Sequence, residues 1–144
     1  MNKPMVIWIP CNPPTSWGKN SKSAFNVGGR AIVVESSRIK TTKGWLSAMV
    51  ESYAPETPFD GPVRLTVSVK YPYPASTPKK LRGGETWHAK RPDLDGVVTT
   101  VQDVLQTMRF VSDDAQFAEV VAAKHRSEDP GIVITLEALE NGTK

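Results

Sequence analysis

Apolar and polar residues alternate most regularly over residues 63–71. The apolar positions are Val63, Leu65, Val67, Val69 and Tyr71, and polar residues stand between them. Successive side chains of a strand point to opposite faces, so this period of two predicts a half-buried strand. A shorter apolar run at residues 6–9 predicts a first strand, which ends at Pro10 because proline cannot donate a hydrogen bond to a sheet.

A different spacing, of three and four residues, marks two helices. One helical face is formed by Leu94, Val97, Val98, Val101, Val104, Leu105 and Met108. This spacing places all seven side chains on one buried stripe and predicts a helix. An earlier helix is predicted from Ser36 or Ser37, either of which can cap it, to about Tyr53, before Pro55. Its apolar positions are Ile39, Trp45, Leu46, Met49 and Val50.

Two hairpins complete the predicted elements. Gly28 and Gly29 separate residues 24–27 from residues 30–34, and such a pair suits a tight turn that needs positive φ. Two more apolar runs, at residues 117–123 and 132–139, flank a turn-like segment and are predicted to form a closing hairpin. The order of elements predicts one α+β domain over residues 1–144, with two main helices packed on a mixed or antiparallel sheet.

Composition adds little to this picture. The net charge of +3 and the pI near 9.1 hint at an anionic partner, but the excess of positive charge is modest. Cys11 is the single cysteine and cannot form an internal disulfide. No apolar stretch is long enough for a membrane span or a secretory signal, so we expect a cytoplasmic protein without membrane association.

Residues 72–92 lose all periodicity and gather proline, glycine and basic residues. The basic residues of this segment are Lys79, Lys80, Arg82, Lys90 and Arg91. Long structureless loops are uncommon in compact domains and tend to be functional or mobile. We predict a basic surface loop, for which contact with DNA and plain solvation are equally good explanations.

The loop ends at the sequence Asp93-Leu94-Asp95, where chemistry is first indicated. If extended backbone continues through Asp95, both aspartates share one face and Leu94 points to the core. Two such close carboxylates repel unless a cation compensates, and Mg²⁺ prefers oxygen ligands of this kind. The plainer alternative is that Asp93 caps the helix and Asp95 complements its dipole.

A second acidic cluster, Ser112-Asp113-Asp114, follows the predicted helix. These acids can join the first pair only if the chain folds back, and the alternative is a solvated turn. Three carboxylates beside a basic loop suit phosphodiester hydrolysis, in which metals activate water and cations hold the backbone. His88 can bind phosphate or act as an acid, but a loop histidine is more often simply exposed. Trp87 can likewise stack on bases or occupy an ordinary surface position.

Residues 87–95 and 110–116, and the distance between these two motifs, resemble the RusA family of Holliday junction resolvases, which is common in phages and prophages. The resemblance extends more loosely to Pro13-Pro14 after the first strand and to Lys124 after the second motif. It implies a homodimeric, Mg²⁺-dependent endodeoxyribonuclease that resolves four-way branched DNA by paired nicks in recombination and repair. Mn²⁺ is a possible substitute for Mg²⁺, and no organic cofactor is implied.

The resemblance also implies roles for individual residues. The catalytic, metal-binding triad maps onto Asp93, Asp95 and Asp114, and Asp113 matches an acidic neighbour. We predict DNA contacts from Lys79, Lys80, Arg82, His88, Lys90, Arg91 and Lys124.

Two positions depart from the family pattern. Gly96 stands where the motif usually continues with asparagine, and Thr99 stands at a functional lysine of the family. Thr99 lies four residues after Asp95, on the same helix face, where a lysine can reach a metal-bound phosphate. The absence of this lysine leaves three hypotheses: Lys90 or Lys124 substitutes for it, the chemistry is slower, or the protein binds junctions without cutting them.

A glycosyltransferase-like enzyme is a further alternative, because such enzymes also use Asp-x-Asp to bind a metal and a nucleotide sugar. A chain of 144 residues is short for that purpose. The second acidic motif has no role in such an enzyme.

Overall fold

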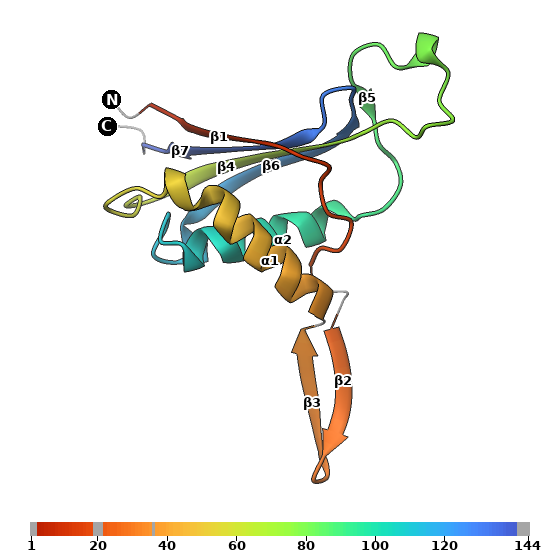
Figure 1. The fold of residues 1–144 in the computed structure, drawn as a ribbon. Coiled ribbons are helices and arrows are strands. Elements are labelled where there is room, and N and C mark those ends of the chain that lie inside the picture. Colours follow the sequence, from red (N-terminus) through yellow and green to blue (C-terminus); the bar gives the residue numbers. More distant parts are fainter. Residues whose placement is uncertain (1–2, 19–21, 36, 141–144) are drawn as a thin grey trace.

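The computed structural model describes residues 3–18, 22–35 and 37–140. A five-stranded sheet has the order β1-β7-β4-β6-β5 and carries both long helices on one face (Figure 1). Its strands are β1 (Met5–Pro10), β4 (Val63–Tyr71), β5 (Thr86–Trp87), β6 (Phe117–Arg126) and β7 (Gly131–Ala138). The β4–β6 pair is parallel and the other pairs are antiparallel, so the sheet is mixed. The predicted α+β fold class is confirmed.

The central strand is β4, which the regular alternation of residues 63–71 predicted. Its five apolar side chains are buried, and the polar ones between them are half-buried on the opposite face. On either side, Ile134 of β7 and Ala122 of β6 stand opposite Val67. The alternation of apolar and polar residues predicted this strand correctly because one face of β4 lies against the helices and the other does not.

The helices α1 (Ser37–Val50) and α2 (Leu94–Thr107) pack on each other and on the sheet. The core side of α2 is formed by Val97, Val101, Val104 and Leu105, all buried. Burial of each such side chain is worth about 1.5–3 kcal/mol, which holds α2 firmly in place. Both predicted helices are confirmed. Ser36, one of the two predicted caps of α1, lies outside the described residues.

The predicted glycine hairpin is also confirmed. Strands β2 (Lys22–Val27) and β3 (Arg30–Glu35) pair antiparallel and extend away from the main sheet (Figure 1). Gly28 and Gly29 have φ of 58° and 83°, the region that glycine adopts without strain.

The prediction of a closing hairpin is wrong. Although β6 and β7 are consecutive strands, β4 lies between them and pairs with both. The connection crosses the end of β4, where the backbone N–H of Ser127 donates to the carbonyl oxygen of Tyr71 at 2.9 Å. The strand β4 thereby takes the centre of the sheet, an arrangement that short-range pattern cannot reveal.

The loop of residues 72–92 has more structure than predicted. It contains a short 3-10 helix, η3 (Lys79–Leu81), and the two-residue strand β5, which pairs with the end of β6. Thr86 and Trp87 lie opposite Arg126 and His125, and the rings of Trp87 and His125 stack with centroids 4.5 Å apart. The end of this loop is therefore fastened to the sheet just before it reaches α2.

Candidate active site

Asp93 and Asp95 lie at the N-terminus of α2 and are both exposed. Asp93 is the N-cap residue, with extended backbone (φ −77°, ψ 140°), and makes no side-chain capping hydrogen bond. The helix begins at Leu94, so the condition of extended backbone through Asp95 is not met. The backbone changes from extended to helical between Asp93 and Asp95. Asp95 stands in the first turn, where the backbone N–H of Gly96 donates to its Oδ1 at 2.9 Å.

The two aspartates nevertheless face one space. Both line a pocket of about 140 Å³ whose other walls are Thr15, Ser16, Trp17, Arg91, Pro92 and Gly96. Thr15, Ser16 and Trp17 come from the segment after β1, far from the acidic motif in sequence. Nothing in the pattern of that segment indicated a role in the site.

The wall formed by residues 14–17 is held by a small polar network. Nε1 of Trp17 and the hydroxyl of Tyr71 both donate to the carbonyl oxygen of Pro14, each at 2.5 Å. Burial raises the pKa of Tyr71 to about 12, so the phenol stays protonated and remains a donor. The last residue of the central strand thus fixes one side of the pocket.

Close packing against the same wall explains why glycine stands at position 96. Gly18, with φ of 77°, packs so closely that a Cβ built on it would stand 2.1 Å from Cα of Gly96. A Cβ on Gly96 would lie 3.0 Å from the carbonyl oxygen of Trp17. The departure from the family asparagine therefore reflects a close contact between two backbones.

The second acidic motif lies beyond the other end of α2, at the start of the 3-10 helix η4 (Asp114–Gln116). Asp113 forms a capping box with Gln116, and its Oδ1 accepts from the backbone N–H of Ala115 at 2.9 Å. The side-chain nitrogen of Gln116 donates to the carbonyl oxygens of Phe59 and Gly61, each at 2.9 Å. Asp113 therefore stabilises the turn, while the neighbouring Asp114 is exposed.

One chain does not bring the predicted triad together. The backbone N–H of Asp114 donates to Oε1 of Gln106 at 3.1 Å, which places Asp114 beside the C-terminal end of α2. At a rise of about 1.5 Å per residue, Asp95 and Gln106 are about 16 Å apart along the helix. Accordingly, the described residues contain no cluster of three acidic, histidine or cysteine side chains suited to a metal.

The predicted DNA contacts divide into exposed and engaged side chains. Lys79, Lys80, Lys90 and Arg91 are exposed. Arg82 instead fastens the basic loop, since its guanidinium donates to the carbonyl oxygens of Thr77 at 2.7 Å and Ala75 at 2.9 Å.

His88 is buried, which contradicts the expectation of an exposed loop histidine. Its ring packs edge-on against Tyr71 with centroids 5.2 Å apart, and its Nδ1 accepts from the backbone N–H of Lys90 at 3.1 Å. Burial lowers the pKa of His88, and the positive charges of Arg126, Lys124 and Lys90 lower it further. These contacts make His88 a support of the loop in this conformation.

Lys124 reaches the first acidic motif from β6. Its Nζ donates to the carbonyl oxygens of Lys90 at 2.5 Å and Pro92 at 2.6 Å. Thr99, in contrast, turns its hydroxyl back to the carbonyl oxygen of Asp95 at 2.9 Å. Of the two cations that were candidates to replace the family lysine, Lys124 is the one whose ammonium group donates to the backbone of the motif.

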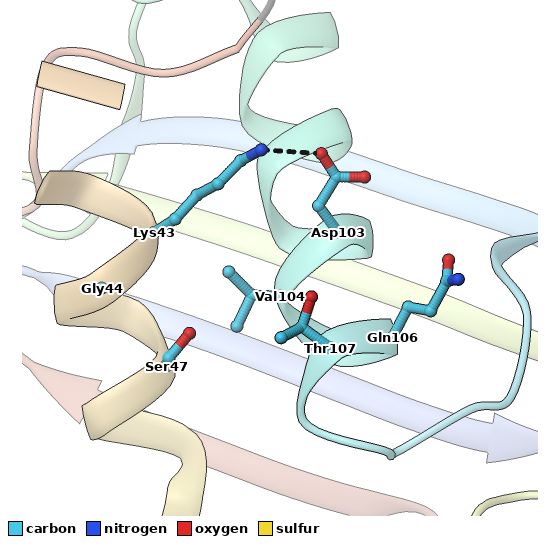
Figure 2. A pocket seen from close by; sticks show the side chains of 7 residues that line it. All are labelled: Lys43, Gly44, Ser47, Asp103, Val104, Gln106 and Thr107. Atoms are coloured by element: carbon cyan, nitrogen blue, oxygen red, sulfur yellow. Dashed lines mark ion pairs between the residues drawn. The ribbon is translucent and has the colours of Figure 1, made fainter. Parts of the chain in front are cut away.

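A second pocket, of about 360 Å³, lies between α1 and α2 (Figure 2). Its main charged feature is the ion pair between Lys43 and Asp103, with Nζ and Oδ2 3.0 Å apart. None of the three predicted catalytic aspartates lines it. The pocket at the start of α2 is therefore the better candidate site.

Comparison with protein families matches residues 10–137 to the family described as Endodeoxyribonuclease RusA. The chain belongs to this family. It is an endodeoxyribonuclease, as the two acidic motifs and their spacing predicted, and its membership supports a junction-resolving activity. A nucleotide-sugar enzyme finds no support in this match.

Two relatives are similar along much of their length. The chain is 26% identical over 129 residues to "Uncharacterized protein YqaN" of Bacillus subtilis (strain 168), which covers 85% of this chain and 89% of the relative. It is 31% identical over 91 residues to "Crossover junction endodeoxyribonuclease rusA" of Lactococcus phage r1t, covering 63% of this chain and 67% of the relative. Within the described residues, no helix has the length and apolar character needed to cross a membrane.

Proposed function

We propose that this chain is a Mg²⁺-dependent endonuclease that resolves four-way DNA junctions by paired nicks, with Asp93, Asp95 and Asp114 as its essential carboxylates. The observation that carries the proposal is the pocket at the start of α2, where Asp93, Asp95 and Arg91 face one space. Carboxylates for a metal and a guanidinium for phosphate are what phosphodiester hydrolysis requires. The name of the phage relative supports a crossover junction as the substrate.

The donors of this pocket fit a hard divalent cation. Carboxylate oxygens are the ligands that Mg²⁺ prefers, and Mn²⁺ accepts the same set. When bound, the metal polarises the phosphate and lowers the pKa of a water molecule. Asp93 and Asp95 hold it, while Arg91 and the exposed Lys90 neutralise the DNA backbone nearby.

A homodimer supplies the third carboxylate. Because α2 separates Asp114 from Asp93 and Asp95 within one chain, we infer that Asp114 of a second copy completes each site. Two equivalent sites related by a two-fold axis also suit a four-way junction, which needs symmetric nicks in two strands.

The edge of β6 supports this arrangement. Among the described strands, β5 pairs with this edge and does so opposite His125 and Arg126, which leaves the first part of β6 uncovered. Val120 and Val121, on opposite faces of that part, are 38% and 48% exposed. Uncovered apolar edges pair readily with another strand. Antiparallel pairing of two β6 strands carries Asp114, at the start of one, toward Lys124, near the end of the other.

The deciding experiment is cleavage of an end-labelled four-way junction with Mg²⁺, with Mn²⁺ and with a chelator. We expect symmetric nicks in two strands with either metal and none with the chelator, while a gel-shift assay shows junction binding in all three. A linear duplex with the sequence of one arm is the control for structure specificity. Binding without nicking in any divalent metal would overturn the proposal.

That outcome would favour a second candidate function, a junction-binding protein with weak or lost cleavage. The observation that favours it is Thr99, which stands at the position of a family lysine and is bonded to the backbone of Asp95. Binding and cleavage measured on the same junction separate the two functions.

A further inference from the structure

Lys124 occupies an unusual place for a strand lysine. It stands opposite the buried Val69 in the parallel register of β4 and β6. Residues at matching register positions share one face of a sheet, so the side chain leaves β6 on the helix-covered face. It is half-buried, and its stem leads toward the segment that connects β5 to α2.

Three hydrogen bonds from this one residue hold that segment. The ammonium group donates to the carbonyl oxygens of Lys90 and Pro92, at 2.5 Å and 2.6 Å. The backbone carbonyl of Lys124 accepts from the backbone N–H of His88 at 3.2 Å. Hydrogen bonds from a charged donor are stronger than neutral ones, and an ammonium has three protons, of which two are used here.

We propose that Lys124 is a positioning residue for Asp93 and not a phosphate contact. Pro92, whose carbonyl it holds, directly precedes Asp93, the N-cap of α2. Catalytic groups must be held within about 0.5 Å of their working geometry, and supporting hydrogen bonds provide that precision. The ammonium also brings a positive charge to the backbone that directly precedes Asp93.

This role explains how the chain works with threonine at position 99. Thr99 places no charge near the pocket, and its hydroxyl is bonded to the backbone of its own helix. Lys124 brings a cation to the motif from the sheet side. The inference rests on the proposed function, since its main readout is metal-dependent cleavage.

The test compares Lys124→Met, which keeps an unbranched apolar stem without the ammonium, with Lys70→Met as the matched control. Lys70 lies on the adjacent strand, on the opposite face, and pairs with Glu85. Single-turnover cleavage of a four-way junction is measured across a range of Mg²⁺ concentrations, together with junction affinity across a range of salt concentrations.

For Lys124→Met we expect cleavage at saturating Mg²⁺ to fall at least tenfold and the Mg²⁺ midpoint to rise. Its salt slope for junction binding should equal that of the wild type, because no phosphate contact is lost. Lys70→Met should leave cleavage and the Mg²⁺ midpoint unchanged. Wild-type cleavage by Lys124→Met, or a shallower salt slope, would overturn the inference.

If Lys124→Met does not fold, Lys124→Arg and Lys124→Gln decide the matter, because both donate hydrogen bonds and arginine alone keeps the charge. We expect arginine to keep a lower Mg²⁺ midpoint than glutamine, and equal midpoints would contradict the role. Absence of cleavage by the wild-type protein would instead refute the proposed function, so the two failures are distinguishable.

Discussion

The two ends of α2 carry the same kind of residue in different surroundings. At the N-terminal end, Asp93 and Asp95 line a pocket that residues 15–17 wall off and that Lys124 supports from the sheet. At the C-terminal end, Asp113 is used to cap a turn and Asp114 stands exposed beside the uncovered edge of β6. Under the proposed function, the first end holds two of the three carboxylates, and the second end supplies the third to a partner.

This contrast shows that an acidic motif acquires a role from its surroundings. Asp113 and Asp114 are adjacent in sequence, but the capping box assigns the first to local structure and leaves the second available. Because α2 is a well-packed helix, it keeps the two acidic motifs apart within one chain. Under the proposed function, Asp114 is then presented to a second copy.

The largest expected effect is on the carboxylates of both ends. Asp93→Asn, Asp95→Asn and Asp114→Asn should each reduce cleavage at least about a hundredfold and leave junction binding intact, because a lost ligand weakens metal capture but also lessens repulsion of phosphate. Wild-type cleavage by any one variant at saturating Mg²⁺ would remove that residue from the site.

Asp113→Ala is the matched control for Asp114→Asn. Loss of its cap should cost about 1 kcal/mol of stability, measurable by urea unfolding, while cleavage at 25 °C is retained. Loss of cleavage in a folded Asp113→Ala protein would break the distinction between the two neighbours.

Mixing inactive variants tests directly whether the two ends of α2 meet across a dimer. Asp95→Asn and Asp114→Asn, refolded together, should form heterodimers in which one site has all its carboxylates. Equal mixing should restore about a quarter of the sites, seen as single nicks in labelled junctions. If each site lies within one chain, every site in the mixture stays defective and no nicking returns.

The basic loop that leads to the N-terminal end should contribute affinity. Lys79→Ala combined with Lys80→Ala should weaken junction binding severalfold and reduce the slope of log affinity against log salt by about 1–2, since each phosphate contact releases counterions. Equal slopes for the variant and the wild type would show that these exposed lysines do not contact DNA.

Thr99→Lys should produce a smaller change, of about two- to threefold. A lysine at position 99 lies over Asp95 and adds a preplaced cation for the charge that develops during phosphoryl transfer, so single-turnover cleavage should increase. An unchanged or lower rate would mean that position 99 is not a vacant catalytic position in this chain.

The smallest expected effect is on the pH dependence of stability, through His88. Because burial and nearby cations lower the pKa of His88, the unfolded chain takes up a proton more readily than the folded protein. Stability from this residue is therefore present above pH of about 6.5 and decreases below it. His88→Gln should lose less stability than the wild type between pH 7.5 and pH 5.5 in urea unfolding, and equal losses would contradict this role.

Much of the fold follows from local pattern. The period of two over residues 63–71, the helical spacing over residues 94–108 and the Gly28-Gly29 turn each predicted an element correctly, because each depends on neighbours a few residues away. The metal-binding and catalytic residues were predicted from their types and from the family motif, and their roles stay predictions.

Tertiary structure decided what depends on distant contacts. Local pattern could not show that β4 separates β6 from β7, since strand order depends on which apolar face the whole sheet buries. Nor could it show the wall of residues 15–17, the burial of His88 or the reach of Lys124 to Pro92, since each joins segments far apart in the chain. The sequence by itself determined which residues are predicted to carry the chemistry. Packing of α2 decided that the two acidic motifs stay apart within one chain, because a helix has a set length per residue and cannot fold back on itself.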